Sequence, residues 1–237
     1  CRPGGNHAPE PGRLPQSWRS LRGINGHVVS PQCHADPMSY CSNGHGRRAS
    51  KRIEFNEMNI LLARPPRRNA RDSGLSVPPL GLAYVAAALR ENGHKVEILD
   101  AYVQRWSWER FTNAIQSKKP TVFGLSAMTP NADVAAKAAK LARPFVQHIV
   151  LGGPHPTAVK MDVFSEMPHL DAAVVGEGEH VSVALMDWWE RNEDGPPPLG
   201  VLTRNHEFKP ATPESRLTAL PRPARDLLPN DTYRYLF

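Results

Sequence analysis

The sequence has little cysteine and no long hydrophobic run. Its three cysteines, Cys1, Cys33 and Cys41, all lie near the beginning of a chain of 237 residues, so none can form a disulfide within the remainder. Such cysteine usage is typical of a reducing compartment. No apolar stretch approaches the about 20 residues of a membrane span, and the first residues lack the apolar core of a signal peptide. We therefore expect a cytoplasmic protein without a membrane partner.

Several motifs of cofactor and nucleophile chemistry are also missing. The first apolar run is followed by Arg64 and Pro65, and not by the G-x-G-x-x-G of a dinucleotide site or by a Walker loop. The acidic residues that a phosphoacceptor receiver domain needs after its first and third strands are absent. The segment "GEGE" (176–179) lacks a third glycine, and its carboxylates would repel a pyrophosphate. With no cysteine after Cys41, Cys–His hydrolase chemistry is excluded there.

Positive charge is concentrated in the first part of the chain. Residues 1–57 hold 8 Lys and Arg against 4 Asp and Glu, whereas residues 58–237 hold 21 against 19, which accounts for the net charge of +6. Nucleic-acid binding needs a basic stripe on a folded face, and none is present. We therefore expect no nucleic-acid partner.

Residues 1–57 show no sustained hydrophobic period and are rich in Gly, Pro, Arg, Ser and His. Such a segment cannot bury enough apolar surface to offset chain ordering. We expect it to be a disordered basic extension, and Met58 to be a candidate for the true start. Cys33, His34, Cys41 and His45 match no standard zinc spacing, so we expect no metal site.

From Met58 onward, apolar runs alternate with segments of helical spacing. The predicted strands are 58–63, 95–101, 121–128, 148–153 and 171–179, and the predicted helices are 81–94, 106–118, 131–145, 161–167 and 180–192. This alternation predicts an α/β fold: a flavodoxin-like, Rossmann-type, doubly wound sheet of five parallel strands in the order 2-1-3-4-5. A C-terminal β-hairpin (199–210, turning at Asn205 and His206) and a proline-broken, extended linker are expected to follow.

Ligands of such sheets bind at the carboxyl ends of the strands, and small or hydroxyl residues follow three of them here. Gly152 and Gly153 expose bare backbone after the fourth strand, and Ser126 and Thr129 supply hydroxyls after the third. The prolines of "GGPHPTA" (152–158) stiffen the loop, which favours a preformed site. The alternative interpretation is that these glycines and prolines only shape a tight turn.

Four segments together resemble a known family. "PPLGLAYVAAALRENGHKVEILDA", "GLSAMTPNA", "VLGGPHPTA" and "VVGEGE" are similar to the cobalamin (vitamin B12)-binding domain that precedes the catalytic core of B12-dependent radical SAM enzymes. "LPRPARDLLP" (220–229) resembles the linker between the two parts. The resemblance covers 58–237 and implies a cobalamin-binding domain at 58–194, followed at 195–237 by the hairpin and a linker toward a radical SAM core.

The resemblance also implies where the cofactor binds. The corrinoid would lie over the carboxyl edge of the sheet, with its nucleotide tail passing Ser126, Thr129, Gly152 and Gly153. The implied cofactor-binding residues are Pro79, Leu80, Gly81, Ser126, Ala127, Met128, Thr129, Gly152, Gly153, Pro154, His155, Pro156, Gly176, Glu177, Gly178 and Glu179. No catalytic residue is implied within this chain.

The sequence departs from the wider family in two motifs. The D-x-H-x-x-G that places a histidine on cobalt is missing; His155 is a candidate substitute, but we favour a loop histidine that hydrogen-bonds or lies at the pocket edge. His94 and His180 are expected to be cap or surface residues. The C-x-x-x-C-x-x-C of the radical SAM core is also missing. The [4Fe–4S] cluster and SAM are therefore expected on a missing or separate domain or subunit, and this chain is not expected to catalyse alone.

The implied function is to hold cobalamin for methyl transfer or related radical chemistry. Two alternatives remain: a non-catalytic flavodoxin-like module that binds a nucleotide-like metabolite or a partner protein, and a degenerate fragment without a ligand. Two groups of side chains have a functional and a structural interpretation. For "RPPRR" (64–68) the choice is phosphate binding or a solvated loop, and for Trp106, Trp108, Trp188 and Trp189 it is corrin stacking or core packing. We expect the structural interpretation in both cases.

Overall fold

The computed structural model describes residues 57–69, 77–213, 218 and 220–233. All of them belong to the second of the two units into which the chain divides, Arg52–Phe237. The predicted disordered extension (apart from Glu57) and the set Cys33, His34, Cys41 and His45 lie outside the described residues. None of the helices in the described ranges combines the length and the hydropathy that a bilayer span requires.

One sheet of six strands organises the domain, in the order β2-β1-β3-β4-β5-β6. The parallel strands are β1 (Asn59–Arg64), β2 (Lys95–Asp100), β3 (Val122–Ser126), β4 (His148–Gly152) and β5 (Ala172–Val174). The predicted order 2-1-3-4-5 is therefore confirmed. A sixth strand, β6 (Val201–Leu202), adds an antiparallel edge next to β5.

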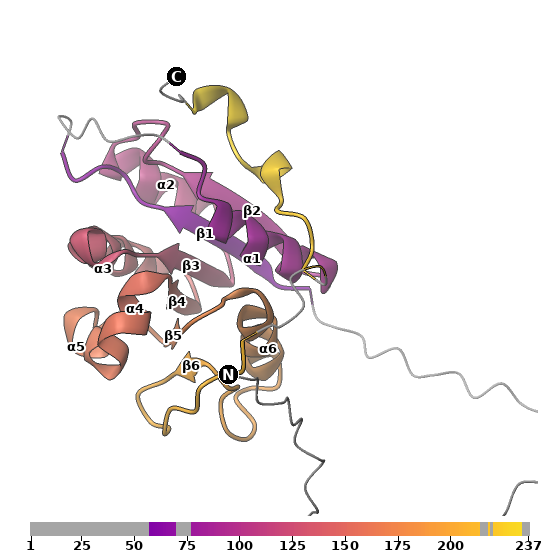
Figure 1. Ribbon diagram of the computed structural model, residues 1–237. Coiled ribbons are helices and arrows are strands. Elements are labelled where there is room, and N and C mark those ends of the chain that lie inside the picture. Colours follow the sequence, from indigo (N-terminus) through magenta and orange to yellow (C-terminus); the bar gives the residue numbers. More distant parts are fainter. Residues whose placement is uncertain (1–56, 70–76, 214–217, 219, 234–237) are drawn as a thin grey trace, which may run out of the picture. The chain divides into compact units, whose positions relative to one another are not determined.

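Helices cover both faces of this sheet. They are α1 (Leu80–Glu91), α2 (Trp108–Lys118), α3 (Ala132–Ala142), α4 (Pro154–Val159), α5 (Val163–Glu166) and α6 (Glu179–Glu190). α1 and α6 pack on one face, whereas α2, α3 and α5 pack on the other (Figure 1). The predicted doubly wound architecture follows from this division, because the crossover from β1 to β2 passes over one face, whereas the crossovers that lead to β3, β4 and β5 pass over the other.

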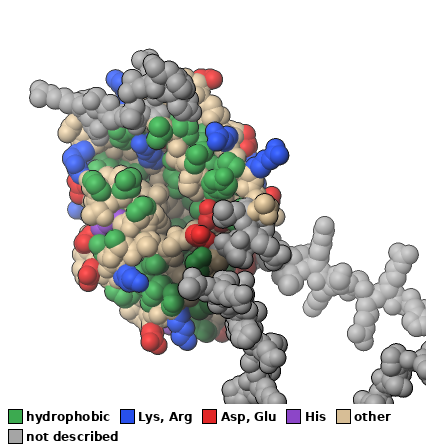
Figure 2. All heavy atoms as spheres, in the orientation of Figure 1, with side chains coloured by type: hydrophobic (Ala, Val, Ile, Leu, Met, Phe, Trp, Pro, Cys, Tyr) green, Lys and Arg blue, Asp and Glu red, His purple; other side chains and the backbone are tan. Residues whose placement is uncertain are grey.

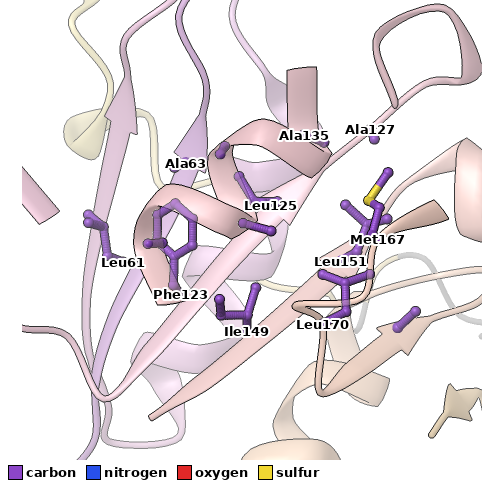
Figure 3. Close-up of a cluster of buried hydrophobic side chains, with 14 of the residues drawn as sticks. Leu61, Ala63, Phe123, Leu125, Ala127, Ala135, Ile149, Leu151, Met167 and Leu170 are labelled. Carbon is purple, nitrogen blue, oxygen red and sulfur yellow. The ribbon is translucent and has the colours of Figure 1, made fainter. Parts of the chain in front are cut away.

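The hydrophobic core has two layers, because side chains of a strand alternate between faces. Leu61, Phe123 and Ile149 point toward α2, α3 and α5 and are essentially inaccessible to solvent (Figure 3). Ile60 and Val122 belong to the opposite layer under α1 and α6. This alternation decides which residues after each strand can face a ligand on the α1–α6 side.

Local signals in the sequence explain several helix ends. Gly93 has φ +89°; its N–H donates to Arg90 O (3.1 Å), and His94 N donates to Leu89 O (3.2 Å). These two bonds form the motif that closes helices with a left-handed glycine, so Gly93 ends α1. α4 was not predicted, because two prolines in "GGPHPTA" (152–158) suggested a loop; Pro154 in fact occupies the first helical position, where a missing N–H costs nothing.

The segment predicted as a β-hairpin (199–210) folds differently. Val201–Leu202 forms β6, and the chain then turns around Asn205, but the returning residues 207–210 form no strand. β6 pairs with β5 instead, with Leu202 opposite Ala173. An isolated two-stranded hairpin is marginal in water, whereas both residues of β6 are buried beside the sheet. The sheet therefore has one strand, β6, in addition to the five that were predicted.

The C-terminal segment 220–233 runs along α1 and the edge strand β2 (Figure 1). Arg90 Nη1 donates to Asp226 Oδ2 (2.6 Å) and its Nη2 donates to Oδ1 (3.3 Å). Leu228 and Tyr233 are buried in a small cluster that α1 shares with the end of β2. Two short 3₁₀ turns interrupt the segment, Arg225–Leu227 and Asn230–Thr232. The predicted linker is thus docked on the domain over these residues.

Candidate functional site

A cavity of about 260 Å³ lies between α1 and α6, near the carboxyl ends of the central strands; we call it the inner cavity. Its floor includes Leu62, Gly124 and Val150, which are paired across β1, β3 and β4. Two residues further along these strands, toward the carboxyl edge, Ser126 pairs with Gly152, and both residues also line the cavity. This is the position where open parallel sheets bind ligands.

Two glycines keep the inner cavity open because a side chain in their place would enter it. A Cβ atom at Gly81 would meet no atom within 4 Å, and one at Gly152 would meet only Leu125 O, at 4.0 Å. Gly152 therefore leaves space in the cavity, although the backbone conformation at this position does not require a glycine. At Gly152 the bare backbone of this strand end thus faces the inner cavity.

Two other glycines allow close packing of the cavity walls. A Cβ atom at Gly124 would lie 2.6 Å from Leu62 Cδ2, and one at Gly178 would lie 3.0 Å from Val85 Cγ2. A side chain at either position would push its neighbour toward the empty space. The walls of the inner cavity therefore depend on the missing side chains in β3 and before α6.

Gly153 has a different role from Gly152. Its φ is +97°, and a Cβ atom there would lie 2.8 Å from both Ala127 O and Ser126 Oγ. L-residues rarely adopt this backbone conformation, so Gly153 is required by the turn between β4 and α4. For this glycine the interpretation as a turn residue is sufficient, although the residue also lines the inner cavity.

A larger space of about 480 Å³, the outer hollow, adjoins the inner cavity at the end of β1 and β3. Leu82 and Ser126 line both spaces. Val77 and Met128 form part of its lining and are more than half exposed, at 52% and 58%. The mouth of the outer hollow thus carries two exposed apolar side chains, which suits a large and partly apolar ligand.

Arginines after β1 hold one side of the outer hollow. The Arg64 and Arg67 guanidinium groups lie over the Tyr102 ring, 4.1 and 4.5 Å from its centroid. Arg64 Nη1 also donates to Val77 O (3.1 Å) and lies 3.7 Å from Asp100 Oδ2. The expectation of a merely solvated "RPPRR" loop is therefore wrong for its first part, because these cations are fixed by an aromatic ring and by hydrogen bonds.

The third arginine of this loop joins the exits of β1 and β3. Arg68 Nη2 donates to Asp133 Oδ1 (2.5 Å) and to Pro130 O (2.8 Å). The hydrogen bond from Arg68 lowers the pKa of Asp133 below its ordinary value. Arg68 and Pro130 both line the outer hollow, so this contact closes the side of the hollow that faces α3.

Ten of the sixteen predicted site residues line one of the two spaces. These are Pro79, Gly81, Ser126, Met128, Gly152, Gly153, Gly176, Glu177, Gly178 and Glu179. The other six do not line either space as the described residues form it: Leu80, Ala127, Thr129, Pro154, His155 and Pro156. Ala127 is buried in the layer on the opposite face, and α4 begins at Pro154 and leads the chain away.

His155 lies outside the lining of both spaces and is held by hydrogen bonds. Its imidazole is 2% exposed, with Nε2 2.8 Å from Glu166 Oε2 and Nδ1 3.4 Å from Thr129 Oγ1. Both ring nitrogens therefore have partners within the protein. The favoured interpretation, a histidine that hydrogen-bonds, agrees with this geometry, whereas a cobalt ligand would need a free nitrogen that faces the cofactor.

The sequence analysis missed the residues that form the cavity walls. These are Leu62, Leu82, Val85, Gly124, Leu125, Val150, Val174 and Ser182. The one local signal was Gly124, a glycine inside an apolar strand, which commonly marks a close approach of another group. Ser182 gave no signal, because a serine inside a helix is indistinguishable from a surface residue without knowledge of the neighbouring helix.

The expectation that His94 is a cap or surface residue is wrong for its side chain. The side chain is 1% exposed, with Nδ1 3.9 Å from Glu190 Oε1 at the far ends of α1 and α6. Among the described residues, neither ring nitrogen of His94 nor this carboxylate oxygen has a hydrogen-bond partner. Burial lowers the pKa of His94 and raises that of Glu190. His180, by contrast, is exposed as expected.

Trp106, Trp108, Trp188 and Trp189 pack in or against the hydrophobic core, as expected. Trp188 and Trp189 are buried in the layer under α1 and α6, and Trp106 and Trp108 pack against the opposite layer.

On the surface, Figure 2 shows Lys and Arg side chains scattered among acidic ones over the viewed face.

Comparisons with known proteins agree with this geometry. A family model described as "B12 binding domain" matches residues 67–186. An uncharacterized methyltransferase of Pyrococcus horikoshii is 33% identical over 187 residues, which are 75% of this chain and 40% of that protein. An anaerobic magnesium-protoporphyrin IX monomethyl ester cyclase of Cereibacter sphaeroides is 34% identical over 140 residues, 56% of this chain and 22% of that protein. The chain thus spans less than half the length of these curated relatives.

Solved structures with a similar fold include two radical enzymes. The cobalamin-dependent S-adenosylmethionine radical enzyme OxsB, with aqua-cobalamin and S-adenosylmethionine bound, has a TM-score of 0.62 at 18% identity and covers 73% of this chain and 25% of its own. The methyltransferase TsrM of Kitasatospora setae, with cobalamin and a [4Fe–4S] cluster bound, has a TM-score of 0.57 at 17% identity, over 70% and 31%. These likenesses show the fold, and the family model covers half of the chain. The chain therefore belongs to the B12-binding domain family, whose cofactor is cobalamin.

Proposed function

We propose that this chain is the cobalamin-binding domain of a B12-dependent radical SAM enzyme and that it holds the corrinoid at the carboxyl edge of the sheet. The observation that carries the proposal is the pair of adjoining spaces, the outer hollow and the inner cavity, with Leu82 and Ser126 lining both. A corrinoid has the matching form, because it consists of a wide ring with a nucleotide tail.

The two spaces differ in the way that ring and tail differ. The outer hollow, about 480 Å³, has an apolar mouth at Val77 and Met128 and suits the face of a large ring. The inner cavity, about 260 Å³, runs between two helices and suits a narrower group. The clearance at Gly152 supports a tail that passes the end of β4, because a Cβ atom there would meet only Leu125 O, at the ordinary contact distance of 4.0 Å.

The residues of the chain would bind and orient the cofactor. Bound cobalamin supplies cobalt-centred methyl-transfer or redox chemistry, which is the cofactor's own. Ser126, between the two spaces, would hydrogen-bond to the tail. Arg64 and Tyr102 would fix the rim against the ring edge. The names of the relatives, a methyltransferase and a cyclase, support a radical SAM partner domain or subunit that carries the cluster and SAM.

A loading experiment tests the proposal. The 237-residue chain would be incubated with hydroxocobalamin, passed through a gel-filtration column and measured by visible absorption. We expect the corrin spectrum to travel with the protein. Gly152→Val should abolish this, since its side chain would fill the inner cavity, whereas the near-isosteric Thr112→Val on α2 should bind as the wild type does. Well-folded wild-type protein that emerges colourless would refute the proposal and favour a nucleotide-like metabolite or a protein as the ligand.

A further inference from the structure

Asp100 is a buried carboxylate between the outer hollow and the C-terminal segment. It ends β2, and its side chain is 0% exposed. Its Oδ2 accepts a hydrogen bond from Tyr233 Oη (2.8 Å) and lies 3.7 Å from Arg64 Nη1. Its Oδ1 accepts from Val103 N (3.1 Å). Because a buried charge without partners is strongly unfavourable, this carboxylate must keep its contacts on both sides.

Arg64 serves both this carboxylate and the wall of the outer hollow. The Nη1 atom that lies 3.7 Å from Asp100 Oδ2 also donates to Val77 O (3.1 Å). The guanidinium group lies 4.1 Å from the centroid of the Tyr102 ring. Arg64, Val77 and Tyr102 all line the outer hollow. The position of this guanidinium group therefore determines where one wall of the hollow lies.

The hydrogen bond from Tyr233 leaves Arg64 available to the wall. At 3.7 Å, Arg64 Nη1 is beyond hydrogen-bonding distance of Asp100 Oδ2. Without the tyrosine hydroxyl, this oxygen would lose its 2.8 Å bond and would attract Nη1, because a charge-assisted bond to a carboxylate is stronger than a bond to a carbonyl. Val77 O would then lose its donor, and the wall of the hollow would shift.

We propose, resting on the function proposed above, that Asp100 and Tyr233 are positioning residues of the corrinoid site. Docking of the segment 220–233 and binding of a corrinoid at the outer hollow would then strengthen each other, through Asp100 and Arg64. Such coupling is reciprocal: if the docked segment raises the affinity for the ligand, the ligand stabilises docking by the same factor. The segment would therefore be held more firmly when the site is occupied.

Hydrogen exchange of the full wild-type chain tests this coupling. The reporters are the amides of 220–233, among them Ala224 N–H, which donates to Ala83 O on α1 (2.9 Å) and belongs to a residue that is 1% exposed. We expect saturating hydroxocobalamin to slow their exchange about fivefold or more. Residues 112–118 of α2, which line neither space, correct for the stabilisation that a ligand gives to the whole fold.

Two variants of the same segment separate the path through Asp100 from docking in general. Tyr233→Phe should weaken binding of hydroxocobalamin about fivefold or more. Asp226→Asn is the matched control, because it removes an exposed contact with Arg90 (2.6 Å) that lies outside the lining of the outer hollow. Since exposed ion pairs contribute little, its affinity should stay within about twofold of the wild type.

A double-mutant cycle tests the last step of the path. Arg64→Gln should itself weaken binding, because it removes the donor to Val77 O. In this background Tyr233→Phe should weaken binding no further, because its effect requires Arg64. Full additivity of the two losses would overturn the path through Arg64.

The outcomes separate this inference from the function on which it rests. If hydroxocobalamin binds but slows exchange in 220–233 no more than in 112–118, the inference fails while cobalamin binding stands. The same conclusion follows if Tyr233→Phe binds as tightly as the wild type, or if Asp226→Asn weakens binding as much as Tyr233→Phe does. If the wild type binds no hydroxocobalamin, the proposed function and the inference fail together. The exchange measurement needs only the wild type, so the test holds even if Tyr233→Phe does not fold.

Discussion

Tyr233 Oη donates a 2.8 Å hydrogen bond to Asp100 Oδ2, which joins the C-terminal segment to the carboxyl end of β2. Asp100 is fully buried, and its other oxygen accepts from Val103 N (3.1 Å). Arg64, which lines the outer hollow, lies 3.7 Å from the same Oδ2 atom. The C-terminal segment is thus fixed beside the rim of the proposed cofactor site.

Tyr233→Phe should destabilise the domain by about 1–3 kcal/mol, because it removes one partner of a buried carboxylate and leaves the rest in place. Urea unfolding measures this free energy. Limited proteolysis should cut the variant within 220–233 faster than the wild type. Tyr84→Phe, on the half-buried part of α1, is a control that removes a tyrosine hydroxyl elsewhere. Equal unfolding midpoints for Tyr233→Phe and the wild type would show that the bond contributes nothing to stability.

Alanine at the two adjacent glycines should have opposite consequences. Gly153→Ala should cost roughly 1–3 kcal/mol, because the residue has φ +97° and its Cβ would lie 2.8 Å from Ala127 O. Gly152→Ala should leave the melting temperature nearly unchanged, because its Cβ meets nothing closer than 4.0 Å. Thermal unfolding without ligand measures both. A larger loss of stability for Gly152→Ala than for Gly153→Ala would contradict the assignment of clearance to one and turn geometry to the other.

Gly124→Ala should narrow the inner cavity more than it disturbs the fold. The new Cβ would lie 2.6 Å from Leu62 Cδ2, the end of a flexible side chain, which can move into the empty space. We expect a loss of stability of about 1 kcal/mol, at the low end of the range for overpacking, and a clear loss of cobalamin affinity, measured by titration. The double variant Leu62→Ala, Gly124→Ala should regain affinity, because it restores the space. If the losses of affinity in the single variants Leu62→Ala and Gly124→Ala simply add in the double variant, the two residues do not act through one cavity wall.

Lowering the pH should reduce the stability of the folded protein, because His94 is buried. Burial lowers its folded-state pKa below the ordinary value of 6.5, while the charges of Asp187 and Glu57 act in the opposite direction. Between the lowered value and 6.5 the unfolded chain binds a proton that the folded protein does not, so stability falls as the pH falls through this window. The raised pKa of Glu190, which faces His94 from α6, gives the opposite slope above its ordinary value of 4.5.

The variant His94→Leu isolates this contribution. As the pH is lowered from about 7 to about 5.5, the free energy of unfolding of this variant should fall by less than that of the wild type. Urea unfolding at each pH measures it. The wild-type curve also contains His148, whose pKa is lowered mainly by burial as well, and only the difference between the two curves reports His94. His169→Leu serves as a control on a less buried histidine. Parallel pH profiles for His94→Leu and the wild type would contradict the prediction.

Much of the fold could be predicted from local patterns. Apolar runs such as "NILLA" in β1 and the Ala-rich stripe of α1 gave the alternation of strands and helices, and Gly93 gave the end of a helix. Short pieces were harder to predict. The two residues of β6 are strand only because β5 offers them a partner, and α4 depends on a left-handed Gly153 that lets Pro154 begin a helix.

The candidate site divides in the same way. The residues that follow each strand, such as Ser126, Gly152 and Gly176, were found by sequence because parallel strands bring their carboxyl ends to one edge. Which of them face the inner cavity depends on side-chain alternation and on the helix opposite, so Ala127 turned away while Ser182 turned in.

The sequence by itself determined the class of fold, the edge of the sheet that carries the site, and the family, because all three depend on short-range patterns and on motifs. Only the tertiary structure decided that Gly152 provides space while Gly153 shapes a turn, that His155 is engaged by Glu166 (2.8 Å), and that Ser182 faces the inner cavity. The physical reason is that open space, burial and a missing hydrogen-bond partner are relations between segments distant in the chain, and they exist only once α1 and α6 pack on the same face.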